Sequence, residues 1–259
     1  MKTALVTGAG ARLGRAMALY LGARGYDVAV HYNTSSEGAD EVVAALEAMG
    51  QRGVAVQADL LNEDETQSLF SRAVTALGAP ITCLVNNASI FEYDNVTTAT
   101  AESWDRHIGS NLRAPFILTQ AMAKQGLAPL TDENGEPKAS GLIVNMLDQK
   151  VRKLNPEFMT YTIAKMGLWA MTQTTAQALA PAIRVNAIGP GPTLQGAHQT
   201  AETFAKQRAR VLLARGANPD DITAALGYFL DAPSVTGQLL CADGGEHLAW
   251  KTQDVHGFE

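Results

Sequence analysis

The stretch Thr7-Gly8-Ala9-Gly10-Ala11-Arg12-Leu13-Gly14 decides the fold of this chain. It follows a short apolar run and leads directly into a segment whose apolar residues recur at helical spacing. Glycines at such a turn let the backbone bend tightly and approach a pyrophosphate, whose charge is stabilised by the free N–H groups of a helix N-terminus. The same glycines could serve only a tight turn, but this strand–turn–helix context favours a dinucleotide-binding site.

Outward from this loop, short Val/Ile/Leu runs alternate with helical segments along the whole chain. This alternation is typical of βαβ units and of a parallel sheet covered on both faces. Seven strands are expected, at residues 3–7, 27–32, 54–58, 81–86, 142–146, 183–188 and 238–242. We therefore predict one α/β domain over residues 1–259, a doubly wound Rossmann fold with a seven-stranded parallel sheet. The polar residues 131–140 are predicted to be an inserted surface loop.

Composition narrows the classes of partner. The chain has 259 residues, 46% of them hydrophobic, and a formal net charge of −6. Because no run of Lys or Arg forms a basic stripe, nucleic acid and anionic membranes are not expected as partners. No apolar stretch near the N-terminus is long enough for a signal peptide or a membrane span, so a cytoplasmic protein is expected.

No metal site is expected from the sequence. Cys83 and Cys241 lie inside apolar runs and are expected to be inert core thiols. The histidines at 107, 198 and 247 lack metal-ligand spacing and are expected to be surface or structural residues.

The end of the second predicted strand indicates which dinucleotide is bound. NAD sites usually have a carboxylate there for the ribose hydroxyls, but this chain has His31-Tyr32-Asn33-Thr34-Ser35-Ser36. A carboxylate would repel a 2′-phosphate, whereas hydroxyls, an amide and the nearby Arg12 can donate hydrogen bonds to it. The alternative is that Arg12 covers the helix and residues 33–36 are an ordinary polar turn. We expect NADP(H) as cofactor.

Tyr161 and Lys165 form the candidate catalytic pair. They stand one helical turn apart at the head of an apolar helical segment that runs to about Leu179. A nearby ammonium favours phenolate and would lower the pKa of the tyrosine, so that it can act as an acid or base. A Tyr and a Lys at this spacing are often only an exposed helix pair. Here the catalytic interpretation is specific because the pair follows the fifth predicted strand of a nucleotide-binding sheet.

The sequence resembles the short-chain dehydrogenase/reductase family over almost its whole length. The resemblance is carried by the glycine loop, Asn86-Asn87-Ala88, Asn111, Tyr161 with Lys165, Gly189-Pro190-Gly191 and Asp243-Gly244-Gly245.

The resemblance implies hydride transfer from a nicotinamide, with Tyr161 as proton donor and Lys165 on the nicotinamide ribose. Asn111 would hold a water in the proton relay, although a satisfied structural amide is the alternative for Asn87 and Asn111. The residues expected to bind the cofactor are Gly8, Arg12, Leu13, Gly14, His31, Tyr32, Asn33, Thr34, Ser35, Asp59, Leu60, Asn87, Ala88, Ser89, Tyr161, Lys165, Pro190, Gly191 and Thr193, with Asp59 at the adenine.

Two departures from the common family pattern are shared with the pteridine reductases, which the chain resembles more closely. The family usually has a glycine at position 12 and a serine at position 148, and this chain has Arg12 and Asp148. An ionised carboxylate would oppose the oxyanion that forms when a ketone is reduced. A carboxyl group suits a ring C=N bond better, since it can accept from an amino-pyrimidine or, if protonated, deliver a proton.

A pterin-like substrate is therefore expected. By the same resemblance, Phe91 would stack on the pterin and Ser89 would contact its ring, with Asp148, Tyr161 and Leu194 completing the substrate site. Residue 91 could instead plug the core. Residues from about 193 to 217 are expected to cover the site as a helical lid.

Two other functions stay open from the sequence: an NADPH-dependent reductase of a 3-oxoacyl or sugar ketone, and a non-catalytic NADP(H) sensor. A homotetramer is expected by resemblance, with interfaces made by the helices around residues 102–124 and 161–179.

Overall fold

The computed structural model describes residues 1–196 and 199–250, and its centre is a seven-stranded sheet in which every neighbouring pair is parallel. The strand order is β3-β2-β1-β4-β7-β8-β9. The strands are β1 (Thr3–Val6), β2 (Asp27–Tyr32), β3 (Gly53–Gln57), β4 (Cys83–Asn86), β7 (Gly141–Met146), β8 (Ile183–Pro190) and β9 (Leu239–Ala242). The predicted fold class is confirmed. The order reverses between β1 and β4, and ligands of open α/β sheets bind at the carboxyl ends of the strands at such a point.

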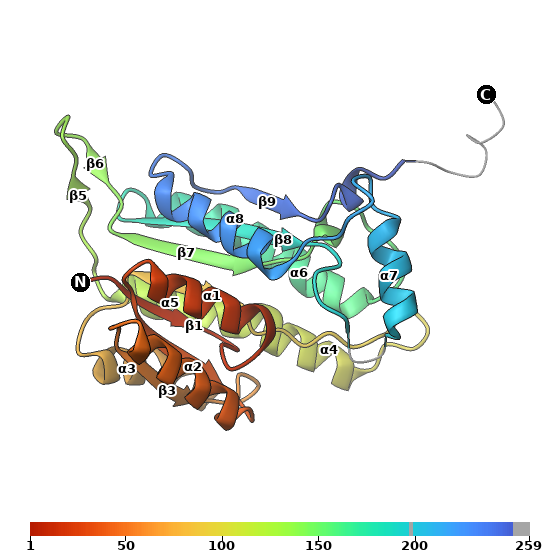
Figure 1. Cartoon of the computed structure of the whole chain (residues 1–259), viewed down its shortest axis with the longest axis horizontal. Helices are drawn as coiled ribbons and strands as arrows, with labels where there is room; N and C mark the ends of the chain where they lie inside the picture. The colour runs from red at the N-terminus through yellow and green to blue at the C-terminus, as the bar shows by residue number, and fades with distance from the viewer. Residues whose placement is uncertain (197–198, 251–259) are drawn as a thin grey trace.

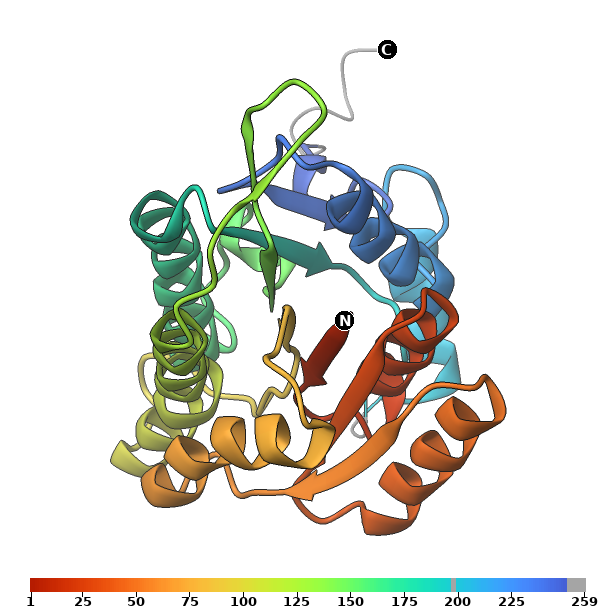
Figure 2. The ribbon, with the colours of Figure 1, turned by 90° about the vertical axis from the view of Figure 1, so that its left-hand side faces the viewer.

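Alternation along the strands builds two cores, one on each face of the sheet. Ala4 and Val6 of β1 belong to one core and Leu5 to the other, and all three are fully buried. The first core is closed by α1 (Arg12–Ala23), α2 (Ser36–Ala48) and α8 (Pro219–Asp231), and the second by α3 (Glu63–Leu77), α5 (Ala114–Lys124) and α6 (Met159–Leu179). Figure 2 looks along this sandwich, with the sheet between the two helix layers.

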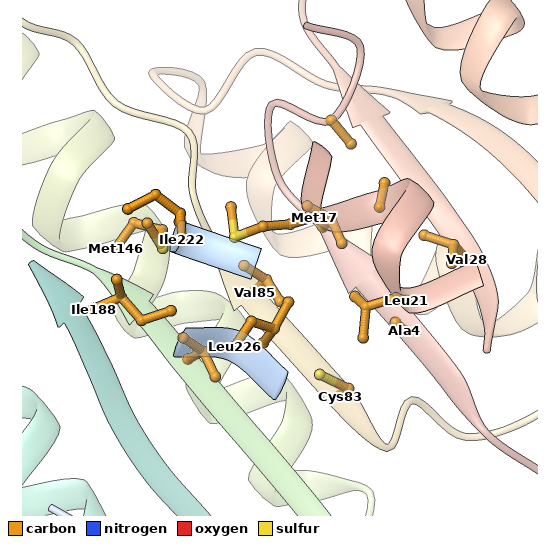
Figure 3. Packing of buried hydrophobic residues seen from close by; sticks show 14 of the residues in the cluster. Ala4, Met17, Leu21, Val28, Cys83, Val85, Met146, Ile188, Ile222 and Leu226 are labelled. Atoms are coloured by element: carbon orange, nitrogen blue, oxygen red, sulfur yellow. The ribbon is translucent and has the colours of Figure 1, made fainter. Parts of the chain in front are cut away.

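The first core packs densely around the helix that follows the glycine loop. Met17 and Leu21 of α1 lie over the strands beside Val28 and Ala4, and Ile222 and Leu226 of α8 continue the layer toward β8 (Figure 3). Each buried aliphatic side chain of this kind contributes about 1.5–3 kcal/mol relative to exposure. The packing therefore fixes the start of α1 relative to the sheet.

Local signals explain where several helices begin and end. The Asn62 side chain accepts hydrogen bonds from the N–H groups of Asp64 and Glu65 at the start of α3, which ends at Gly78 with a left-handed φ of 72°. Thr100 and Ser103 form a capping box at the start of α4 (Ala101–Ile108). A π-helical turn, Gly109–Arg113, joins α4 to α5.

The structure differs from the sequence-based expectation in small ways. The insertion predicted as a loop contains a short antiparallel hairpin, β5 (Leu130–Thr131) and β6 (Pro137–Lys138), turned at Gly135 with a φ of 81°. It projects from the end of the molecule opposite α7 (Ala201–Ala209), toward which the strands point (Figure 1). β8 continues two residues further than expected, because Gly189 and Pro190 pair with Cys241 and Ala242.

The cysteines differ from each other in environment. Cys83 is fully buried, and burial raises the pKa of its thiol to about 12, whereas Cys241 in β9 is only partly buried. Within residues 1–196 and 199–250, no helix is both long enough and apolar enough to cross a membrane.

Candidate active site

The glycine loop between β1 and α1 is shaped by close backbone contacts. Gly8 has a φ of 64°, which favours glycine. A Cβ at Gly14 would lie 2.1 Å from the carbonyl oxygen of Gly8 and 2.6 Å from Asn87 Nδ2, so only glycine fits there. The free N–H groups at the start of α1 receive no side-chain cap. This arrangement fits the pyrophosphate of a dinucleotide, which would approach the loop and the helix N-terminus together.

The His31 side chain supports this loop through a hydrogen bond to its backbone. Its Nδ1 accepts a hydrogen bond of 2.9 Å from the Gly8 N–H, and its Nε2 faces the Ala58 carbonyl at 3.1 Å. The ring is buried, and burial lowers its pKa to about 4, so the neutral ring that this pattern requires is the stable form. The cofactor contact expected of His31 stays a prediction; the observed hydrogen bonds of its ring are to the backbone of the glycine loop and of Ala58.

The end of β2 is polar and open. Asn33, Thr34 and Ser35 are exposed, and Ser35 lies against the glycine loop, since a Cβ at Gly10 would meet the Ser35 carbonyl at 3.0 Å. Arg12, in contrast, donates to the carbonyls of Gln195 at 3.0 Å and Leu194 at 3.3 Å. Its guanidinium therefore contacts the segment after β8 rather than the end of β2, where the 2′-phosphate was expected. Arg12 also has a left-handed φ of 52°, a backbone conformation that favours glycine.

Asn87 and Ala88 close the loop from β4. The Thr7 hydroxyl accepts from the N–H groups of both residues at 2.9 Å, and Asn87 Nδ2 donates to the Thr7 carbonyl at 2.8 Å. Asp59 and Leu60, expected near the adenine, follow β3 and are partly buried, and the Asp59 carboxylate accepts from the Leu61 N–H. The expected nucleotide residues thus gather at the carboxyl ends of β1 to β4.

The catalytic candidates meet at the carboxyl end of β7. The Tyr161 hydroxyl donates to Asp148 Oδ2 at 2.9 Å, and Asp148 Oδ1 accepts from the Lys150 N–H at 2.8 Å. Lys165 is buried, and its Nζ donates to the Met146 carbonyl at 2.8 Å and lies 5.6 Å from the centre of the Tyr161 ring. The side chains at 148, 161 and 165 therefore share one site.

The electrostatics of this group differ from the expectation. Burial raises the pKa of the Tyr161 phenol well above its usual value of 10.0, and the adjacent Asp148 raises it further. Burial lowers the pKa of Lys165 to about 8. Lys165 does not depress the tyrosine pKa as predicted, because its ammonium is directed to the Met146 carbonyl and the phenol faces a carboxylate. The raised pKa favours the neutral phenol, whose hydroxyl donates to Asp148.

Burial also raises the pKa of Asp148, while the hydrogen bonds from the Lys150 N–H and the Tyr161 phenol lower it in part.

Asn111, in the π-helical turn, is fully buried. Its Oδ1 accepts from the Ile90 N–H and its Nδ2 donates to the Ile90 carbonyl, both at 2.8 Å. The Asn111 side chain thus ties the turn to residue 90, which matches the structural-amide alternative.

Two phenylalanine rings lie beside Tyr161, one in contact with it and one stacked on the first. Phe91 is half exposed, packs edge-on to Tyr161 at 4.7 Å between ring centres, and stacks on Phe158 at 4.3 Å with 9° between the planes. Lys150 Nζ lies over the Phe158 ring at 5.2 Å. Phe91 does not plug the core. Phe158 was missed by the sequence analysis; it has a left-handed φ of 55° just before α6, and no spacing pattern marks such a residue.

The expected lid begins after β8. Thr193 is buried and its hydroxyl donates to the Gly191 carbonyl, Leu194 is partly buried, and Ser89 is exposed. α7 lies at this end of the molecule (Figure 1).

Of the three histidines expected to be surface or structural, His107 is fully buried, His247 is paired with Asp243, and residue 198 lies outside the described residues. In the part of the chain that the structure describes, no three His, Cys, Asp or Glu side chains are grouped to hold a metal ion.

Comparison with protein families and sequences gives a consistent match. A family described as short chain dehydrogenase matches residues 2–208. A 3-oxoacyl-[acyl-carrier-protein] reductase, FabG, of Staphylococcus aureus is 31% identical over 252 residues, covering 95% of this chain and 98% of that protein.

Solved structures match over nearly the whole chain. FolM alternative dihydrofolate reductase 1 from Brucella canis, complexed with NADP, has a TM-score of 0.89 and 40% sequence identity, covering 98% of this chain and 97% of its own. The angucycline C-6 ketoreductase LanV with bound NADP has a TM-score of 0.84 and 31% identity, with 96% of each chain covered. The NADP(H) expected from the sequence is the cofactor that these structures contain.

Proposed function

This chain belongs to the short-chain dehydrogenase family, and on that premise we propose that it is an NADPH-dependent reductase acting on a ring C=N bond of a pterin-type substrate such as a dihydropterin or dihydrofolate. The observation that carries the proposal is the hydrogen bond from Tyr161 to Asp148. A carboxyl group beside the proton donor suits protonation of a ring nitrogen and opposes formation of a ketone oxyanion. The 40% identity to FolM supports the same substrate class.

Each residue of the site has a separate role in the proposed reaction. When bound, NADPH supplies the hydride, and Gly8, Gly14, Ala88 and Thr193 are proposed to hold it, with Asn33 to Ser35 at the 2′-phosphate. Tyr161 donates its proton to the ring nitrogen, since its phenol is neutral and buried. Asp148 keeps the phenol oriented and accepts from the amino-pyrimidine, and Lys165 holds the ribose. Phe91 offers an aromatic edge or face to a flat ring, worth on the order of 1 kcal/mol beyond its buried area.

A reductase of ketones is the second candidate, because the FabG and LanV relatives carry that activity in their names. The two candidates are separated by NADPH oxidation with matched panels: dihydropterins and dihydrofolate against 3-oxoacyl thioesters and cyclic ketones. We expect turnover with the first panel. Rapid reduction of ketones with no turnover of pterins would reject the proposal in favour of the second candidate.

Tyr161→Phe is the matched variant for either substrate. It removes the proton donor but keeps the ring, so turnover is expected to fall on the order of 10²–10⁴-fold while NADPH affinity is retained. If the wild-type protein binds NADPH but reduces neither panel, the third possibility, a cofactor sensor, is supported instead.

We also propose a cytoplasmic homotetramer. Trp104, Phe116, Ile163 and Met166 of α4, α5 and α6 are 37–45% exposed, an apolar surface on the helices expected at the interface. Light scattering of the purified protein is expected to give four times the 27.5 kDa chain mass, and a monomer at micromolar concentration would contradict it.

A further inference from the structure

A buried polar cluster lies behind the catalytic tyrosine and is not used by the proposed chemistry. It consists of Asp94, Ser103, His107 and Thr160, called here the Asp94 cluster. Its members come from three segments: the loop after β4, α4 and the first turn of α6. Asp94, His107 and Thr160 are 2%, 0% and 2% exposed. Burying polar groups this completely is costly unless each is bonded, so the geometry of the bonds decides what the cluster does.

The hydrogen bonds of the cluster form a chain in which each group donates to the next, ending at the Asp94 carboxylate. The Glu92 N–H donates to His107 Nε2 at 3.1 Å, so the neutral ring carries its proton on Nδ1. Nδ1 lies 2.6 Å from the Thr160 hydroxyl and donates to it. The Thr160 hydroxyl in turn donates to Asp94 Oδ2 at 2.5 Å, and Ser103 donates to the same oxygen at 3.0 Å.

The charge states agree with this direction. Burial lowers the pKa of His107, which keeps the ring neutral. Burial acts to raise the pKa of Asp94, but the hydrogen bonds from Thr160 and Ser103 outweigh it and hold the pKa below its usual value. The cluster therefore contains one buried carboxylate that is satisfied only by the residues around it.

The cluster reaches the catalytic tyrosine by two routes. Asp94 Oδ1 accepts from the Thr160 N–H at 3.1 Å, and the Asp94 carbonyl accepts from the Met159 N–H. These are first-turn N–H groups of α6, which has no capping side chain at Phe158. The His107 ring also packs edge-on to the Tyr161 ring, 6.0 Å between centres. Tyr161 follows Thr160 directly, so the cluster sets both the backbone and the ring of the proton donor.

We propose that Asp94, Thr160 and His107 are positioning residues that aim the Tyr161 phenol at Asp148 and at the reacting atom. The inference rests on Tyr161 being the proton donor of the proposed function, but it does not depend on which substrate is reduced. An error of about 1 Å in the placement of a catalytic group costs on the order of 10²-fold in rate. The cluster is built to prevent such an error.

The test uses Thr160→Val, which keeps the shape and removes the hydroxyl, and Thr160→Ser, which keeps the hydroxyl. Thr160→Val is expected to lower kcat roughly 10- to 100-fold with NADPH affinity unchanged within about twofold, and Thr160→Ser to stay near wild type. Amide hydrogen exchange at residues 159–162 is expected to be faster in Thr160→Val. The control is Thr172→Val, a fully buried threonine further along α6 that bonds Asn145 and Leu168, which should lower stability without lowering kcat.

A double-variant cycle separates positioning from general destabilisation. If the cluster acts through Tyr161, Thr160→Val adds no further loss to Tyr161→Phe. The inference is overturned if Thr160→Val and Thr160→Ser lose activity equally, if Thr172→Val loses as much, or if the losses at 160 and 161 multiply. Each assay uses the substrate that wild type reduces, so a wild type active only on ketones would count against the proposed function alone.

Discussion

The Tyr161 hydroxyl and Asp148 Oδ2 lie 2.9 Å apart in a hydrogen bond, and the phenol is the donor. The contact joins the end of β7 to the first turn of α6. It makes the carboxylate one of the causes that keep the phenol protonated, after burial itself. This relationship gives a prediction about pH.

Asp148→Asn is expected to move the alkaline loss of activity to lower pH. A negative charge beside a phenol raises its pKa, so removing the charge lowers it. Reduction needs the protonated phenol, and activity is therefore lost as pH rises through the pKa of Tyr161. Asp148 also raises the pKa of Lys165, which is about 8, so removing the carboxylate lowers the pKa of both groups, and the variant should lose activity at lower pH than wild type. The measurement is kcat/KM against pH.

Glu246→Gln is the control for this pH effect. The pKa of Glu246 is raised first by burial and then by the nearby Asp148 carboxylate. Glu246 makes no hydrogen bond to Tyr161, whose hydroxyl donates to Asp148. Its removal should leave the alkaline side of the profile unchanged. A profile that Asp148→Asn leaves unchanged, or shifts to higher pH, would contradict the electrostatic account.

The lowered pKa of the buried His31 ring leads to a second pH prediction, for the stability of the fold. Burial lowers its pKa from 6.5 to about 4, so between these values the unfolded chain binds a proton that the folded chain does not. The stability contributed by the neutral ring is complete above pH 6.5 and is lost as pH falls toward 4. The loss between about pH 7.5 and about pH 5 amounts to roughly 2 kcal/mol.

The measurement is the free energy of unfolding from urea titrations at both pH values. His31→Asn keeps an acceptor for the Gly8 N–H but cannot titrate, so its free energy of unfolding should fall less between the two pH values than that of wild type. An equal fall in both proteins would mean that other groups cause it. NADPH affinity of wild type should not change through His31 over this range, because the folded protein keeps the ring neutral, and its bond to Gly8 intact, until the pH approaches 4.

The sequence predicted the seven strands and the meeting of Asp148, Tyr161 and Lys165, for physical reasons. Strand periodicity and the glycine loop are local signals, and one helical turn brings residues 161 and 165 to one face. The Asp148–Tyr161 contact was predictable because both lie where strand β7 and helix α6 meet at the carboxyl edge of the sheet.

Other parts of the site depend on contacts between distant segments. The stacking of Phe158 on Phe91 needs a left-handed backbone at residue 158, which its residue type does not indicate. His107 was expected to be surface or structural, and its bond to Thr160 joins residues 53 positions apart. Arg12 was expected at the 2′-phosphate because it lies in the glycine loop and can donate hydrogen bonds, while its side chain reaches carbonyls more than 180 positions away. The sequence-based cofactor contacts remain predictions.

Gly14→Ala is expected to abolish NADPH binding and to destabilise the fold. The new Cβ would sit 2.1 Å from the Gly8 carbonyl oxygen, and the loop has to move to admit it. Overpacking of this kind costs about 1–3 kcal/mol. The matched control is Gly25→Ala, which also strains the backbone, at φ 82°, but meets no atom within 4 Å. Thermal unfolding and NADPH titration should show both variants destabilised and only Gly14→Ala unable to bind.

The hydrogen bonds of Arg208 indicate how the segment expected to be a lid is held in place. Its Nη1 donates to the Pro192 carbonyl at 2.9 Å, at the start of the segment, and its Nη2 donates to the Gly216 carbonyl at 2.9 Å and to Asn218 Oδ1 at 2.8 Å, at its end. One guanidinium thus joins both ends of the segment that carries Thr193 and Leu194. Lysine has a single donor group and cannot span both ends.

Arg208→Lys is therefore expected to raise KM for the substrate by roughly tenfold, since hydrogen bonds to a charged group contribute about 1.5–3 kcal/mol. The effect on kcat should be smaller, because Asp148 and Tyr161 lie on other elements. Amide hydrogen exchange should become faster at residues 192–196 and 216–218. The control is Arg210→Lys, an exposed arginine two residues further along the chain. Equal KM values for wild type and Arg208→Lys would mean that the segment from 192 to 218 holds its position without this side chain.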